Sequence, residues 1–149
     1  MSYNDLRKGR FSEANRIYFI TTVTQNRSEI FKDFNSARIV INSMRQLHEC
    51  EYVQSLSWVV MPDHLHWLIQ LSDEYSLAEI IKRLKAQSAH SINRYLDSSG
   101  SVWQRSYYDR GLRKEEDIKV VSRYIVANPL RAGLVKEIGD YPHWDAVWL

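Results

Sequence analysis

Two apolar runs on either side of the dipeptide Pro62-Asp63 constrain the fold of this chain most strongly. Residues 53–61 (VQSLSWVVM) and 64–71 (HLHWLIQL) are rich in β-branched and aromatic residues, which is the composition of β-strands. Pro and Asp between them are turn-forming residues, so the segment predicts an antiparallel hairpin. Successive side chains of a strand point to opposite faces. The second strand therefore presents an apolar face that other elements must cover, formed by Leu65, Trp67, Ile69 and Leu71.

The segments around the hairpin complete a repeating pattern. Residues 16–24 (RIYFITTVT) predict a first strand. Apolar residues at helical spacing predict a helix from the expected N-cap Ser36 to about Glu51. The same spacing predicts a second helix over residues 77–96, with Ser76 as its N-cap and Glu79 completing a capping box.

Residues 103–112 predict a fourth strand, and residues 115 to about 128 predict a third helix whose first turn is acidic. The order strand, helix, strand, strand, helix, strand is that of a ferredoxin-like βαββαβ fold. We therefore expect an α+β protein with an antiparallel sheet and an additional C-terminal helix. Residues 136–149 are expected to be irregular and anchored by Trp144 and Trp148.

The length and composition of the chain are those of one folded domain. The chain has 149 residues, of which 44% are hydrophobic and 26% charged, so we expect a single domain over residues 1–149 with its core at about 16–135. A single cysteine, Cys50, excludes an internal disulfide framework. The N-terminal residues form no apolar signal segment, and no apolar run reaches the roughly 18 residues of a membrane span. We therefore expect a cytoplasmic protein with no membrane partner.

His64 and His66 are the first candidates for chemistry. They are separated by one residue on a predicted strand, so both imidazoles point to the same face, opposite the apolar stripe. We expect that face to be free for a site. Two imidazoles on one face form half of a divalent-metal site and need a third ligand from elsewhere. The alternative is a chance His-x-His pair without a metal.

Positive charge is unevenly distributed, although the net charge is only +2. Residues 80–96 and 118–136 contain basic residues and no acidic ones. Such surfaces can bind a phosphate backbone, or they can be ordinary solvated helix faces. In the first run the candidates for nucleic-acid contact are Lys82, Arg83, Lys85 and Arg94. Further candidates, chosen by their location, are His90, Arg105, Arg110 and Arg113.

Three blocks of the sequence resemble one family. Val59-Val60-Met61-Pro62-Asp63-His64-Leu65-His66-Trp67 resembles the His-hydrophobe-His signature of the HUH nucleases, as found in the single-tyrosine, IS200-like transposases and especially the REP-associated tyrosine transposases. Residues 122–134 (SRYIVANPLRAGL) resemble the helix of that family that carries a nucleophilic tyrosine, followed by its Asn-Pro-x-x-Ala-Gly segment. The stretch that precedes this helix in the family resembles Trp103-Gln104-Arg105 and Tyr108-Asp109-Arg110. The blocks occur in the expected order over most of residues 16–135.

The resemblance implies a function. It implies a transposase that cuts and rejoins single-stranded DNA, with Tyr124 as nucleophile, a 5′-phosphotyrosine intermediate, and Mg²⁺ or Mn²⁺ as cofactor. It also implies that the DNA partner is a hairpin of a palindromic repeat. From the pattern alone, Tyr124 is a helix residue filling the core, and only the motif favours the nucleophile. A covalent intermediate conserves the energy of the cut bond, and a metal can polarise the scissile phosphate.

The third metal ligand is less defined. Asn128 lies four residues after Tyr124, so both side chains share one face if the helix continues. Its amide oxygen is our candidate ligand, although family members can use Gln there, and an Asn before Pro can simply end a helix. Asp63 is a turn residue or a partner of the metal site.

Two other functions remain open from the sequence. One is a non-catalytic nucleic-acid-binding protein on the same fold, which would not need Tyr124. The other is a small zinc hydrolase that uses His64 and His66 with a third His, Cys or acidic ligand. The assembly is also open, because members of the family act as homodimers that exchange the tyrosine helix or as monomers.

Overall fold

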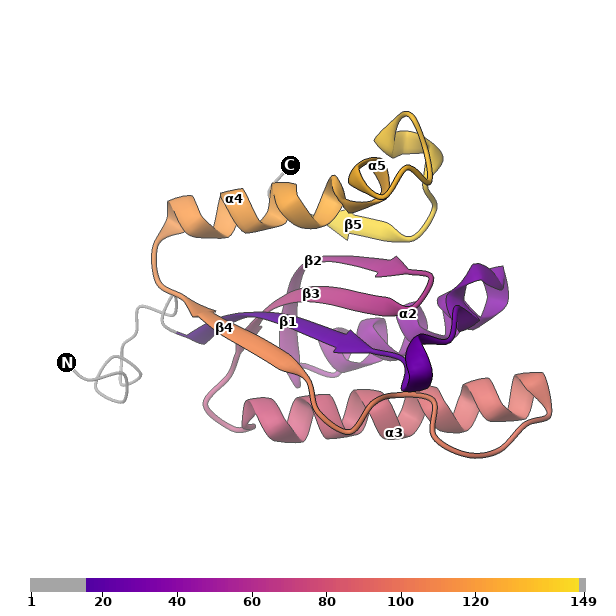
Figure 1. The fold of residues 1–149 in the computed structure, drawn as a ribbon. Helices are drawn as coiled ribbons and strands as arrows, with labels where there is room; N and C mark the ends of the chain where they lie inside the picture. The colour runs from indigo at the N-terminus through magenta and orange to yellow at the C-terminus, as the bar shows by residue number, and fades with distance from the viewer. Residues whose placement is uncertain (1–15, 148–149) are drawn as a thin grey trace.

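A five-stranded antiparallel sheet forms the centre of the protein (Figure 1). The structure is a computed structural model and describes residues 16–147. The strands follow the order β4-β1-β3-β2-β5, so the ferredoxin-like arrangement is confirmed with one more strand added beside β2. The strands are β1 (Ile17–Val23), β2 (Val53–Met61), β3 (His64–Leu71), β4 (Tyr108–Leu112) and β5 (Trp144–Ala146).

Helices cover both faces of this sheet. Figure 1 shows α2 and α3 on one side and α4 on the other, with the short α5 continuing from the end of α4. Short 3-10 turns occupy Gln25–Arg27, Ile30–Lys32 and Ile138–Asp140. The helices are α2 (Phe34–Glu49), α3 (Leu77–Leu96), α4 (Glu115–Val126) and α5 (Asn128–Arg131).

The alternation of β3 divides the core in two. Leu65, Trp67 and Ile69 are completely buried in the cluster formed with α2 and α3, as the apolar stripe predicted. Leu68 points the other way, into a smaller cluster with Ile118, Val121 and Ile125 of α4. The histidine face of the sheet is therefore covered by a helix, and our expectation that it would be free is wrong.

Local capping rules explain how two helices begin. Ser76 and Glu79 form the predicted capping box at the start of α3. The predicted N-cap of α2 is wrong, because Asp33 takes this position and accepts a hydrogen bond from the backbone N–H of Ser36. Asp and Ser are both good N-caps, and α2 begins three residues earlier than predicted because the Asp33 carboxylate caps its first turn.

Two further expectations need correction. The fourth strand is shorter than predicted, because only residues 108–112 pair with β1, and Trp103 makes an isolated bridge to Thr24. The C-terminal segment is not irregular throughout, since Trp144–Ala146 pairs with β2 as β5. Trp144 is half-buried and donates from Nε1 to the carbonyl of Ile138, while Trp148 lies outside the described residues.

None of the helices formed by residues 16–147 combines the length and the apolar character that a membrane span requires.

Candidate active site

The two histidines lie side by side on β3, as their spacing predicted. Their ring centroids are 4.7 Å apart. His66 is opposite Thr21 of β1, and Nδ1 of His66 is hydrogen-bonded to Oγ1 of Thr21 at 2.8 Å. Nδ1 of His64 donates to Oδ1 of Asp63 at 2.7 Å, because a carboxylate can only accept.

These bonds prepare both rings for a ligand. Since Nδ1 of each ring is occupied, Nε2 is the nitrogen available for coordination. Metal-binding histidines typically donate their other N–H to a carboxylate or another oxygen, which fixes the ring orientation. The donor chemistry of His64 and His66 therefore fits a divalent metal ion.

The surroundings of His66 favour the neutral imidazole that a metal requires. Burial, followed by the charges of His64 and Arg131, lowers the pKa of His66 to about 3. Partial burial acts to raise the pKa of Asp63, but hydrogen bonds and charges from His64 and Arg27 outweigh it and the pKa is lowered. Asp63 is therefore an anion held between Arg27 and His64, in addition to its place in the turn.

Tyr124 lies beside this pair. It projects from α4, and the centroid of its ring is 6.1 Å from that of His66. Phe19 of β1 is a neighbour of both, with its ring centroid 5.3 Å from that of His66 and 6.1 Å from that of Tyr124. Tyr124 remains 47% exposed whereas His66 is 9% exposed. The tyrosine is thus not a core-filling residue, and an external substrate can reach it above a sheltered histidine.

The structure adds Arg131 to the site, a residue that we did not single out from the sequence. Its guanidinium carbon lies 3.8 Å from the centroid of the Tyr124 ring. Thr21 and Phe19 were also missed as site residues. Strand alternation gives a signal for both, because residues 19 and 21 of β1 share one face and β1 is paired with the histidine strand.

Asn128 does not continue the tyrosine helix. α4 ends at Val126, with Ala127 as its C-cap, and Asn128 begins the separate helix α5. We expected Asn128 and Tyr124 to share one helix face only if the helix continued through residue 128, and it does not. Within residues 16–147, no hydrogen bond joins the Asn128 side chain to either histidine, and its role as third ligand stays a prediction.

The described part of the chain offers no group of three or more His, Cys, Asp or Glu residues that could hold a metal ion. The third ligand that a zinc hydrolase requires is thus not found among residues 16–147.

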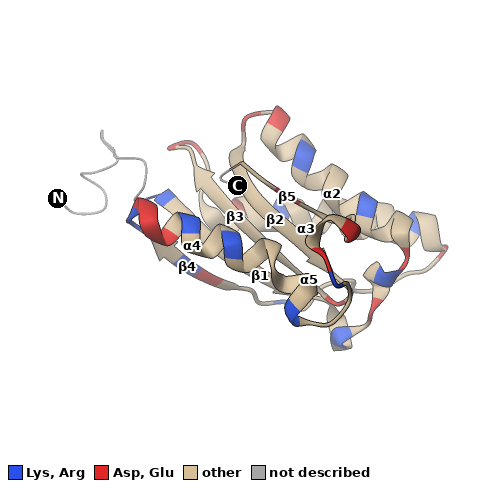
Figure 2. Ribbon diagram, turned by 90° about the horizontal axis from the view of Figure 1, so that it is seen from above, with Lys and Arg blue, Asp and Glu red and all other residues tan. Residues whose placement is uncertain are grey.

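The candidates for DNA contact divide between the two sides of the sheet. Tyr108 and Arg110 of β4 are paired with Thr21 and Phe19, so they project from the histidine face. Figure 2 shows basic residues along α4 and acidic ones confined to its first turn, away from Tyr124.

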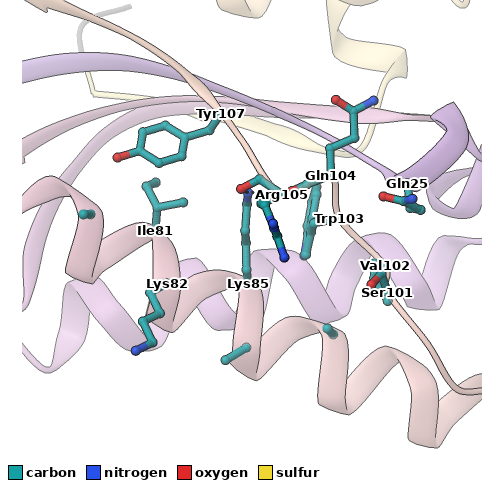
Figure 3. A pocket seen from close by; sticks show the side chains of 13 residues that line it. Gln25, Ile81, Lys82, Lys85, Ser101, Val102, Trp103, Gln104, Arg105 and Tyr107 are labelled. Atoms are coloured by element: carbon teal, nitrogen blue, oxygen red, sulfur yellow. Dashed lines mark hydrogen bonds between the residues drawn. The ribbon is translucent and has the colours of Figure 1, made fainter.

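A groove of about 670 Å³ lies on the other side, between α3 and residues 101–107 (Figure 3). Lys82 and Arg105 line it together with Trp103 and Tyr107. Lys85 also lines it, but its ammonium group donates to the backbone carbonyls of residues 104, 105 and 106 at 2.8, 3.3 and 3.1 Å. All three donors of Lys85 are used, so its predicted contact with DNA finds no support in this geometry.

The other basic candidates have different surroundings. Arg83 stacks on Tyr52 at 4.4 Å and approaches Tyr75 at 5.8 Å, so it covers the beginning of β2 and does not face the groove. The remaining three candidates are exposed and are not brought to the histidines by any contact among residues 16–147: His90, Arg94 and Arg113.

Fold and site together define a class: an α+β protein with a ferredoxin-like sheet that carries a histidine pair beside an exposed tyrosine. The chain belongs to the family of IS200-like transposases, whose family model matches residues 13–128. This confirms the family to which the sequence motifs pointed.

The chain is similar to proteins named as REP-associated tyrosine transposases. A protein of Haemophilus influenzae with the provisional name REP-associated tyrosine transposase is 28% identical over 144 residues, which cover 85% of this chain and 77% of the relative. The REP-associated tyrosine transposase of Escherichia coli is 27% identical over 88 residues, covering 58% of this chain and 50% of the relative. The solved structure of a REP-associated tyrosine transposase bound to a REP hairpin has the same fold, with a TM-score of 0.74, 20% identity, and 87% of this chain and 76% of that chain covered.

Proposed function

We propose that this transposase is a metal-dependent endonuclease and strand-transferase for single-stranded DNA, with Tyr124 as its nucleophile. The observation that carries the proposal is the position of Tyr124 next to His66, with ring centroids 6.1 Å apart. The two residues come from separate elements, α4 and β3, and their meeting on one face of the sheet is not needed to bury apolar surface, since Tyr124 is exposed.

The reaction is a transesterification. The phenol oxygen of Tyr124 forms a bond to the scissile phosphorus while the bond from phosphorus to the 3′ oxygen breaks. The phenol proton ends on the departing 3′ oxygen, which leaves a free 3′-hydroxyl and a 5′-phosphotyrosine. Attack by another 3′-hydroxyl reverses the step and joins strands. One phosphoester replaces another in each step, so no external energy source is required.

His64 and His66 would hold the metal through their Nε2 atoms, and we propose Asn128 as a further ligand. Mg²⁺ or Mn²⁺ in this position would polarise the scissile phosphate. Asp63 and Thr21 fix the orientation of the two rings through the hydrogen bonds to Nδ1.

The proposed substrate is a hairpin from a palindromic repeat with adjoining single-stranded DNA; the structurally similar REP-associated tyrosine transposase was solved bound to a REP hairpin, which supports the hairpin part of this proposal. Tyr108 and Arg110 on the histidine face are placed to contact the strand near the cut, and Lys82 and Arg105 to contact it beyond the β4 edge. Tyr124 packs against His66 of its own chain, so we propose that one copy can cleave DNA in cis.

The test is incubation of end-labelled hairpin DNA, from repeats flanking the gene, with Mn²⁺ and either wild-type or Tyr124→Phe protein. Tyr95→Phe is the matched control, because Tyr95 on α3 is 46% exposed and Tyr124 is 47% exposed. We expect a covalent adduct with the wild type and the control only. Binding without cleavage by every variant would favour a non-catalytic DNA-binding protein. Cleavage by Tyr124→Phe would instead point to a metal-activated water.

A further inference from the structure

The segment Asn128–Gly133 folds back on the end of the tyrosine helix. Pro129 lies in the first turn of α5 and cannot donate a backbone hydrogen bond. Gly133 then adopts φ +74°, the left-handed conformation that ends many helices. The N–H groups of Gly133 and Leu134 donate to the carbonyls of Leu130 and Pro129 at 3.0 and 2.9 Å. This pair of bonds is a Schellman motif, and it closes α5 after a single turn.

The closed turn seats Arg131 on Tyr124 through two separate contacts. Nη2 of Arg131 donates to the backbone carbonyl of Tyr124 at 2.7 Å. The guanidinium carbon lies over the tyrosine ring, 3.8 Å from its centroid. One contact fixes the arginine to the main chain of α4, and the other covers one face of the phenol ring, so the orientation of the ring depends on α5.

No acidic side chain in the described part of the chain forms an ion pair with Arg131 that could draw it away from Tyr124. Among residues 16–147, no carboxylate lies within ion-pair distance of Arg131. A guanidinium that stacks on a ring without an acidic partner keeps its flat face on the ring and its remaining N–H groups toward solvent.

We propose that Arg131 is the positioning residue of Tyr124. In this inference, which rests on the proposed function, Arg131 holds the phenol ring in line with the scissile phosphate, and the Asn-Pro-x-x-Ala-Gly turn exists to place the arginine there. Phe19 also contacts this ring, in an edge-on arrangement with the two ring centroids 6.1 Å apart. The ring is therefore in contact with a β1 side chain and an α5 side chain, which confine it although it is nearly half exposed.

Loss of such confinement affects the rate and leaves DNA affinity largely unchanged. An exposed tyrosine without its neighbours samples several rotamers, and misplacement of a reacting group by about 1 Å can reduce a rate about 100-fold. We therefore expect Arg131→Gln to slow single-turnover adduct formation at saturating hairpin DNA by about 10- to 100-fold, with less than about a threefold change in Kd.

The comparison of Arg131→Gln with Arg131→Lys separates positioning from charge. Lysine restores the positive charge but cannot stack a planar guanidinium on the tyrosine ring. The rate of adduct formation by Arg131→Lys should therefore stay within about threefold of that of Arg131→Gln. The matched control is Arg45→Gln, which removes an exposed arginine of α2, on the opposite side of the sheet from Tyr124. The control should keep the wild-type rate. A wild-type rate in Arg131→Gln, or full rescue by lysine, would overturn the proposal.

The rate is compared after urea unfolding has given the folded fraction of each variant, so a purely structural role for Arg131 would lower the folded fraction and leave the rate per folded molecule unchanged. That outcome would also overturn the proposal. If the wild type forms no adduct with any hairpin, the proposed function itself fails, which is a different result from equal rates in wild type and variant.

A second variant tests the turn without changing Arg131. Gly133→Ala places a Cβ where no atom lies within 4 Å, but at φ +74°, so it strains the turn and nothing else. Gly139→Ala is the control, because its Cβ also meets no atom within 4 Å and its φ lies outside the left-handed region. We expect Gly133→Ala to have a rate between those of wild type and Arg131→Gln, and Gly139→Ala to have the wild-type rate. Equal rates in the two glycine variants would contradict the role of the turn.

Discussion

Lys85 and Lys82 are neighbours on α3 and line the same groove, yet the structure predicts opposite consequences for their removal. Lys85 donates to three backbone carbonyls of the segment that leads into β4. Lys82 is exposed. We predict that Lys85→Met destabilises the fold and leaves the contacts with DNA phosphates unchanged. Lys82→Met should instead weaken the contacts with DNA phosphates and leave the stability of the fold unchanged.

The magnitude follows from the hydrogen bonds. A hydrogen bond from a charged group contributes about 1.5–3 kcal/mol net. The bond to the Gln104 carbonyl is the shortest of the three and is partly buried, while the other two are exposed. We therefore count one strong bond and expect a loss of about 1.5–3 kcal/mol, which lowers Tm by about 3–12 °C in a domain of this size. Lys82→Met should change stability by less than about 0.5 kcal/mol.

Two assays separate the variants. Urea or thermal unfolding measures stability, and fluorescence anisotropy of labelled hairpin DNA over a range of salt concentrations measures phosphate contacts. Lys82→Met should reduce the slope of log K against log salt concentration by about 1, and Lys85→Met should leave the slope unchanged. The reasoning is refuted if Lys85→Met is as stable as wild type and loses one unit of slope.

Three further predictions concern the sheet and the site. In metal-free protein, His66 takes up a proton near pH 6.5 when the chain is unfolded and only near pH 3 when it is folded. Protonation therefore favours the unfolded state, and the free energy of unfolding falls as the pH decreases from about 6.5 toward 3, by about 2 kcal/mol at pH 5. His66→Gln should have a shallower stability profile between these pH values, and identical slopes would contradict the assignment. Ser57 and Ser122 share a buried hydrogen bond of 3.0 Å between β2 and α4, so either alanine variant should lose about 1–3 kcal/mol in urea unfolding and the double variant less than their sum; strict additivity would show that the bond contributes nothing. Chelation with EDTA, or His64→Ala, should abolish cleavage while hairpin affinity stays within about threefold of wild type, and cleavage in EDTA would remove the metal from the account.

Several features were predictable because they depend on local sequence. The hairpin around Pro62-Asp63, the capping box at Ser76, and the face shared by His64 and His66 follow from turn chemistry, capping and strand alternation. The family motif directed attention to Tyr124, which the structure shows exposed beside His66 although its helical pattern alone favoured a core residue; its role as nucleophile stays a proposal. These rules act over a few residues, so the sequence contains them in full.

The missed features depend on contacts between distant segments. Lys85 looks like any basic residue of an exposed helix, and only the path of residues 104–106 gives it three acceptors. β5 has three residues and forms because β2 offers a free edge. The contact of Arg131 with Tyr124 requires α4 to end at Val126 and α5 to close at Gly133, and the sequence motif alone does not reveal this arrangement.

Intact-protein mass spectrometry after reaction with an unlabelled hairpin oligonucleotide tests the central claim most directly. The proposal predicts that the wild-type mass increases by the mass of the 3′ fragment of the cut strand, with the modified residue mapped to Tyr124 after proteolysis, and that Tyr124→Phe shows no increase. An adduct mapped to Tyr107 or Tyr108, or cut DNA with no mass increase in the protein, would contradict Tyr124 as the nucleophile.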